Sequence, residues 1–127
     1  MSVEKLLPSK YGYSNVAISS GRLAFIAGQI AEDEHGAFVG QGDFQAQIRQ
    51  VFLNLKTILT HLNATADDVV KLNYYIVGLA PDRLVAARAE RDAMFESALK
   101  PASTLIGVEA LFKPDALIEV DMVVHRP

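Results

Sequence analysis

The chain of 127 residues contains no cysteine and no tryptophan, and no apolar run long enough to span a membrane. Without cysteine, disulfides, thiolate nucleophiles and thiolate-bound metals are excluded. Its 12 basic and 15 acidic residues give a net charge of −3 and form no long basic run, so we expect no nucleic-acid or membrane partner. The opening MSVEKLL has charge but no apolar segment behind it, so no signal peptide is expected and the cytoplasm is the default compartment.

The length suits one domain with one core, so residues 1–127 are interpreted as a single domain. Half of the residues are hydrophobic, and this slight excess favours some surface buried between subunits. The three histidines, His35, His61 and His125, fall on a loop, a helix flank and the C-terminal end. They share no face, so we expect no metal site.

Two helices are predicted from three–four apolar spacing. The first begins at Phe44 with Asp43 as its N-cap, and its stripe is Phe44, Ile48, Val51, Phe52, Leu55, Ile58, Leu59 and Leu62. The second begins at Pro81 and is expected to reach about Leu99, with the stripe Leu84, Ala87, Met94, Phe95 and Ala98.

Strands are predicted on both sides of these helices. VAIS and LAFIAG (residues 16–19 and 23–28) indicate a hairpin turning at Gly21, and both faces of LAFIAG are apolar or small, as in a strand covered on both sides. VVKLNYYIV (69–77) alternates, with Val70, Leu72, Tyr74 and Ile76 on one face, and STLIGVEAL (103–111) and ALIEVDMVV (116–124) complete the chain. The predicted class is α+β, a mostly antiparallel sheet with two helices on one face.

The last strand places two carboxylates on one face. Ile118, Val120, Met122 and Val124 are uniformly apolar and should meet the helices, whereas Glu119 and Asp121 point the other way with Leu117 and Val123. Carboxylates are rarely buried without a partner or a function. This mixed face fits either a subunit interface that contains a polar cleft or a solvated sheet surface.

Five segments in this order resemble the reactive-intermediate deaminase (RidA/YjgF) family: FIAGQI, QIRQVFLNLKTIL, ADDVVKLNYYIVGL, PASTLIGVEAL and ALIEVDMVV. The resemblance runs from Tyr11 to Val124. It implies a chorismate-mutase-like fold and a homotrimer with clefts between subunits. It also implies hydrolysis of an enamine or imine to a ketoacid and ammonia, with no cofactor.

Family positions transfer residue by residue. The glutamate that positions the attacking water corresponds to Glu119, and the cleft tyrosine corresponds to Tyr13, which either caps the cleft or only packs. The family's SGQ is AGQ here, so Gly28 is kept and Ala27 replaces the serine. The resemblance therefore makes Glu119 the candidate catalytic residue; the alternative is a structural ion pair. Asp121 is interpreted as structural.

The substrate-binding arginine of the family is absent. Its PARS segment is PAST here, so Ser103 stands at the arginine position and Leu105 replaces a characteristic cysteine. A guanidinium binds a carboxylate through two parallel hydrogen bonds, and a hydroxyl cannot supply that charge. Amino-acid-derived imines should therefore bind poorly in the usual way.

Two arginines of the second helix can supply another cation. Arg91 lies in the middle of the apolar stripe, and Arg88 lies at its edge, where the family usually has a cleft-lining asparagine. Arg88 either binds substrate or extends along the surface into solvent. Arg91 either binds substrate or bridges buried carbonyls or an acid such as Asp121.

Two classes of function remain open. The first is an enzyme that hydrolyses an imine, an enamine or a related small electrophile in the cleft. Glu119 would orient water or carry a proton to the departing amine, and Arg88, alone or with Arg91, would hold an anionic group. The second is a non-enzymatic trimer that binds a small metabolite or assists a pathway, which the change to PAST favours.

Overall fold

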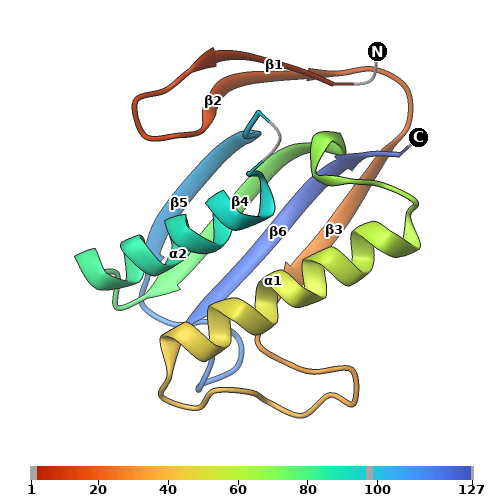
Figure 1. The fold of residues 1–127 in the computed structure, drawn as a ribbon. Helices are drawn as coiled ribbons and strands as arrows, with labels where there is room; N and C mark the ends of the chain where they lie inside the picture. The colour runs from red at the N-terminus through yellow and green to blue at the C-terminus, as the bar shows by residue number, and fades with distance from the viewer. Residues whose placement is uncertain (1–2, 97–98, 127) are drawn as a thin grey trace.

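A computed structural model describes residues 3–96 and 99–126 and shows a six-stranded mixed sheet with both helices on one face (Figure 1). The predicted fold class is confirmed. Along the sheet the strand order is β1-β2-β5-β4-β6-β3. The elements are β1 Val3–Pro8, β2 Ser14–Ser19, β3 Leu23–Gln29, α1 Phe44–His61, the short 3₁₀ helix η1 Ala66–Asp68, β4 Val69–Val77, α2 Pro81–Met94, β5 Ala102–Val108 and β6 Ile118–His125.

The predicted hairpin between residues 16–19 and 23–28 is wrong. A turn does occur at Gly21, which has φ +81°. However, β2 pairs antiparallel with β1, a strand that the sequence analysis missed, and β3 pairs with β6 at the opposite edge of the sheet. The turn therefore sends the chain across the sheet, because β3 finds its hydrogen-bond partner in the last strand.

The first helix agrees with its prediction. The Asp43 side chain caps it by accepting a hydrogen bond from the Ala46 amide at 3.1 Å. After the helix, Asn63 takes a left-handed conformation with φ +53°. The centre of the predicted stripe is buried against the sheet: Ile48, Val51, Phe52, Leu55 and Leu59.

The second helix is shorter than predicted and ends at Met94. Ala87 and Phe95 are buried as expected, whereas Leu84 and Met94 are only partly buried. Ala98, the last member of the predicted stripe, lies outside the described residues. Arg91 is buried, as its central place in the stripe indicated.

One residue of β4 departs from the predicted alternation. Leu72, Tyr74 and Ile76 are buried beneath the helices. A register shift between Val69 and Lys71 against β6 makes Val69 the buried residue in place of Val70. Such a bulge adds one residue to one strand and reverses the side-chain pattern beyond it.

The two faces of β6 differ as predicted. Ile118, Val120, Met122 and Val124 are at most 1% exposed and form the centre of the core under α1 and α2. No described helix or loop covers the other face of the sheet (Figure 1). Large apolar side chains of neighbouring strands lie on that face, with Phe25 77% exposed and Ile106 45% exposed.

The outer edge of β5 is open for most of its length. β2 runs parallel to β5 but pairs with it only between Ser14 and Ala102. From Ser103 to Val108 that edge pairs with no other strand among the described residues. An unpaired edge is a place where a partner or a ligand can approach the backbone.

Gln47 joins the start of α1 to the start of β6. It is fully buried, and its amide nitrogen donates to the carbonyls of Gly40 (2.9 Å) and Asp115 (3.1 Å). Its amide oxygen accepts from the Leu117 amide at 2.8 Å. This one side chain therefore satisfies three backbone groups and sets where β6 begins.

Replacing Gln47 with leucine should strongly destabilise the fold. The change keeps the side-chain size but leaves three backbone groups without a partner, each costing about 1–3 kcal/mol if it stays dry. We expect the free energy of unfolding in urea to fall by roughly 2–5 kcal/mol. The control is Gln45→Leu on the exposed side of the same helix. Equal unfolding midpoints for the two variants would contradict this role.

Candidate functional site

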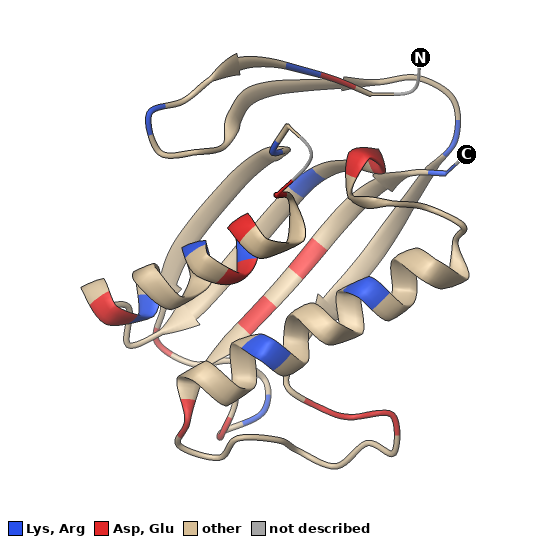
Figure 2. Ribbon diagram, in the orientation of Figure 1, with Lys and Arg blue, Asp and Glu red and all other residues tan. Residues whose placement is uncertain are grey.

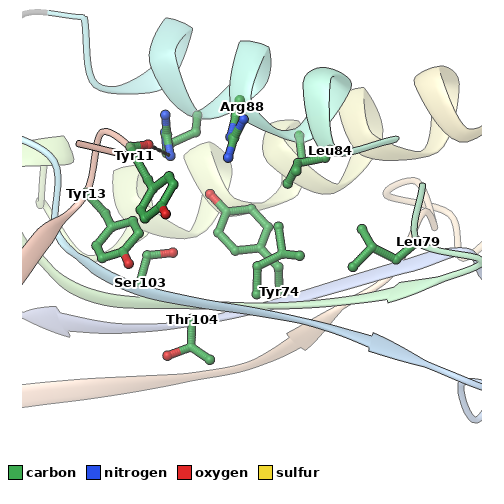
Figure 3. Close-up of a pocket in the computed structure, with 11 residues that line it drawn as sticks. Tyr11, Tyr13, Tyr74, Leu79, Leu84, Arg88, Ser103 and Thr104 are labelled. Atoms are coloured by element: carbon green, nitrogen blue, oxygen red, sulfur yellow. Dashed lines mark hydrogen bonds between the residues drawn. The ribbon is translucent and has the colours of Figure 1, made fainter. Parts of the chain in front are cut away.

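A cavity of about 490 Å³ opens where β2 diverges from β5, beneath α2 (Figure 3). Its walls come from the loop between β1 and β2, from β4 and β5, and from α2. The lining residues are Tyr11, Tyr13, Tyr74, Leu79, Leu84, Ala87, Arg88, Arg91, Ser103, Thr104 and Leu105. Five predicted site residues thus meet in one cavity: Tyr13, Arg88, Arg91, Ser103 and Leu105.

Strand register explains why Ser103 and Leu105 line this cavity. β5 runs parallel to β4, with Ser103 opposite Leu72 and Leu105 opposite Tyr74. Leu72 and Tyr74 face the helices, so their partners on β5 face the same way. The predicted position of Ser103 near a cation of α2 therefore follows from the fold.

The guanidinium of Arg91 is already bound within the chain. It donates from Nη1 to the Tyr11 carbonyl (3.2 Å) and from Nε to Asp92 (3.1 Å), and it forms an ion pair with Asp92. A side chain at Gly12 would come within 2.7 Å of Nη2, and Gly12 has φ +90°. Arg91 therefore holds the loop of Tyr11 in place. The bridging interpretation fits these contacts, although the acid is Asp92 and not Asp121.

Arg88, one turn earlier on α2, is different. No hydrogen bond or ion pair joins its side chain to another residue in the described part of the chain. It is partly buried and extends along the cavity (Figure 3). Its positive charge is therefore available to an anionic ligand.

Two tyrosines form one end of the cavity. The rings of Tyr11 and Tyr13 stack with centroids 6.2 Å apart and an interplanar angle of 18°. Their loop is closed by the Ser9 amide, which donates to the Tyr13 carbonyl at 2.8 Å, and by the Ser9 hydroxyl, which accepts from the Tyr11 amide. Tyr13 is predicted from the sequence and Tyr11 is not, although the YGY pattern around Gly12 is a signal for both.

Glu119 and Gly28 meet on the opposite, uncovered face of the sheet. A Cβ at position 28 would lie 2.1 Å from Glu119 Oε2, so a side chain there would push this carboxyl group out of its present position. No hydrogen bond or ion pair to Glu119 is formed within the described residues. Partial burial and then the negative charge of Asp121 raise the pKa of Glu119 above its ordinary value.

Asp121, its neighbour on that face, is held by polar groups. Asn73 Nδ2 donates to Oδ1 at 2.8 Å, and the Tyr75 hydroxyl donates to Oδ2 at 3.0 Å. This hydrogen bond and partial burial raise the pKa of the Tyr75 phenol. Asp121 thus has the structural surroundings expected from the sequence, with neutral donors in place of a basic residue.

The predicted site is therefore divided into two parts. One part is the cavity between β5 and α2, and the other is the Glu119–Gly28 pair on the far side of the sheet. A single chain does not bring the two parts together. Across residues 3–96 and 99–126, no three His, Asp or Glu side chains group as metal ligands. No described helix is long and apolar enough to cross a membrane.

Residues 4–126 match the family model described as Endoribonuclease L-PSP. The chain belongs to this family, known also as the RidA/YjgF or RutC family. The RutC family protein of Pyrococcus horikoshii is 33% identical over 119 residues, covering 94% of this chain and 91% of the relative. At 27% identity, the 2-iminobutanoate/2-iminopropanoate deaminase of Dermatophagoides farinae aligns with 94% of this chain and 90% of its own length.

Solved structures of the RidA/YjgF family share the fold. A Rid family protein of unknown function from Yersinia pestis superposes with a TM-score of 0.91 at 37% identity, covering 98% of this chain and 99% of that chain. RidA from an Antarctic Psychrobacter gives a TM-score of 0.71 at 28% identity, covering 93% of this chain and 92% of that chain. The backbone is thus closer to the Yersinia protein than to this RidA.

The two carboxylates of β6 should respond oppositely to loss of charge. Asp121→Asn weakens two hydrogen bonds to a charged acceptor, so the free energy of unfolding should fall by about 1–3 kcal/mol. Glu119→Gln removes a charge that has no partner and repels Asp121, so stability should stay equal or rise. Thermal melts of both variants at neutral pH make the comparison. A larger loss in Glu119→Gln would reverse the two roles.

Proposed function

We propose that this protein hydrolyses an imine or enamine of a small reactive metabolite, with release of ammonia and without a cofactor, in clefts between the subunits of a homotrimer. Membership of the RidA/YjgF family supports the reaction class, and one relative carries the name of an imine deaminase. The observation that carries the proposal is the Glu119 carboxyl group beside Gly28. Within the described residues it has no hydrogen-bond or ion-pair partner, and no described element covers its face of the sheet.

The chemistry follows from the two parts of the site. Arg88 holds an anionic group of the ligand in the cavity. From a neighbouring subunit, Glu119 orients a water molecule toward the carbon of the C=N bond and accepts a proton as the C–O bond forms. The same carboxyl group passes that proton to nitrogen, which gives a carbinolamine. It then carries the remaining hydroxyl proton to nitrogen as the C–N bond breaks and the C=O bond forms, so ammonia and a carbonyl compound leave. A raised pKa suits Glu119 to this exchange, because a proton shuttle works best near the operating pH.

A trimer would cover the exposed apolar face and bring the two parts together. Phe25 and Ile106 lie on that face beside Glu119 and Asp121. In a trimer the apolar side chains would form the core of the interface, and the two carboxylates, which interface cores usually lack, would lie in a polar cleft within it. Figure 2 shows acidic residues along β6 and basic residues scattered over several elements. Together with the net charge of −3, this distribution disfavours RNA as a substrate.

A non-enzymatic trimer that binds a small metabolite is the second candidate. One observation favours it: Ser103 replaces the arginine of active members, and no cation of β5 takes its place. Under this alternative the cavity binds a ligand but Glu119 has no role in turnover. The two candidate functions therefore predict different results when Glu119 is replaced: loss of product formation for the enzyme, and unchanged ligand binding for the non-enzymatic protein.

Light scattering on purified protein at micromolar concentration should give the mass of three chains. Phe25→Glu should shift it toward monomer, because a charge replaces an apolar side chain at the proposed interface. Val85→Glu is the matched control, since Val85 is 64% exposed on α2, away from that face. A stable wild-type monomer would exclude the interface cleft.

Small amino-acid-derived imines should be poor substrates. An amino-acid oxidase generates them in situ, and ketoacid release is then followed with and without the protein. We expect slow turnover, because the Ser103 hydroxyl group cannot bind a carboxylate as the two parallel hydrogen bonds of a guanidinium do. Glu119→Gln should lower the turnover rate further, by about 10²-fold or more. Ser103→Arg should raise the rate, alone or together with Arg88→Asn, which removes the competing cation.

The outcomes separate the candidates. Wild-type turnover as fast as that of an arginine-bearing family member would refute the interpretation of Ser103. Ligand binding without turnover, unaffected by Glu119→Gln, would establish the non-enzymatic alternative.

A further inference from the structure

Tyr74 carries a hydroxyl group whose partner is missing. The residue lies on β4, its ring packs 6.3 Å from the ring of Phe52, and only 3% of it is exposed. Its hydroxyl oxygen is buried and makes no hydrogen bond to any described residue. A buried donor without a partner destabilises a protein, so phenylalanine would serve better if packing were the only role.

The hydroxyl group is aimed into the cavity. Figure 3 shows it pointing from the sheet toward α2, between Tyr11 and Arg88. Arg88 has no hydrogen bond or ion pair in the described chain, so its side chain can move aside without breaking one. Tyr11 is half exposed. The side chains beside the hydroxyl group are thus ones that an entering ligand can displace.

We propose that Tyr74 and Arg88 together bind the carboxylate of the ligand, with the Tyr74 hydroxyl donating to one oxygen and the Arg88 guanidinium to the other. This inference rests on the proposed function, in that the cavity is taken as the ligand site. The pair would replace the missing arginine at position 103 with a cation from the helix and a neutral donor from the strand.

The charges in the cavity agree with these two roles, a cation from Arg88 and a neutral donor from Tyr74. Arg91 is the other cation of the cavity wall, and each of its three guanidinium nitrogens already contacts Tyr11 or Asp92. Burial raises the pKa of the Tyr74 phenol far above its ordinary value, so it stays protonated and able to donate. A neutral donor beside one unpaired cation suits a singly charged carboxylate.

The cavity walls away from Arg88 indicate the chemical character of the rest of the ligand. Leu79 and Leu84 lie on the other side of Tyr74 from Tyr13 and Ser103 (Figure 3). Cavities of about 300–1,000 Å³ accommodate ligands larger than a three-carbon acid. The ligand class is therefore an imino or keto acid with a large apolar side chain, whose carboxylate lies near Arg88 and whose side chain lies against the leucines.

The test measures binding of 4-methyl-2-oxopentanoate, with 2-oxopropanoate as the small comparison, by calorimetry at neutral pH. Wild type should bind the larger acid more tightly. Tyr74→Phe should weaken that binding about tenfold, as expected for loss of a hydrogen bond to a charged group. Its unliganded melting temperature should stay the same or rise, because an unsatisfied buried hydroxyl group has gone.

The matched control is Ser19→Ala, which also removes a buried hydroxyl group without a hydrogen-bond partner, but outside the cavity. It should leave binding unchanged. Arg88→Gln, measured in parallel, tests the site itself and should also weaken binding.

Each remaining outcome overturns part of the proposal. If Arg88→Gln weakens binding and Tyr74→Phe does not, the role of Tyr74 is wrong while the cavity remains the site. If Tyr74→Phe lowers the melting temperature, the hydroxyl group is structural and the inference fails. If wild type binds neither acid, the carboxylate-binding cavity fails and the proposed function loses its anion site.

Discussion

The alternation of side chains along β6 is the constraint on which the rest of the structure depends. Successive residues of a strand point to opposite faces, so four apolar residues of β6 are sealed beneath α1 and α2. The same geometry forces Glu119 and Asp121 onto the face that has no cover. Moving the strand by one residue would bury both carboxylates, and burying these charges would strongly destabilise the fold. Gln47 prevents this by binding the backbone at Leu117, immediately before the strand begins.

This constraint also separates the groups that a catalytic site needs. Glu119 lies on one side of the sheet because side chains alternate along β6 and its neighbours Ile118 and Val120 face the helices. Ser103 lies on the other side because it pairs with Leu72 of β4, which faces the helices. No side-chain rearrangement within one chain can join them through a sheet. Either the two parts act independently, or they belong to sites completed by another copy. The exposed Phe25 favours the second, since a large apolar side chain on an open sheet face suits contact with another copy.

The sequence predicts what depends on local periodicity and misses what depends on distant pairing. Asp43, the stripe of α1 and the two faces of β6 follow from spacing and capping, which neighbouring residues determine. The partner of β3 does not, because an apolar strand after a glycine turn can pair with any exposed edge. The candidate residues show the same division: Glu119 and Ser103 are predicted from family positions and stay predictions, whereas the loop contacts of Arg91 depend on where the β1–β2 loop lies.

Tyr74 shows how a core position can carry a functional signal. Alternation alone assigns it to the apolar face of β4, where valine or isoleucine would fit without a polar atom. A tyrosine there requires a partner for its hydroxyl group, and the described chain supplies none. The neighbouring tyrosine, Tyr75, points to the other face and finds Asp121. Of these two adjacent tyrosines, Tyr75 has a hydrogen-bond partner and Tyr74 has none among the described residues, and this difference is why we propose a ligand as the partner of Tyr74. If Arg88 and Tyr74 bind the anion, this one role explains two features of the cavity. It explains why Ser103 can stand where the family resemblance implies an arginine, and why the Tyr74 hydroxyl group has no partner among the described residues.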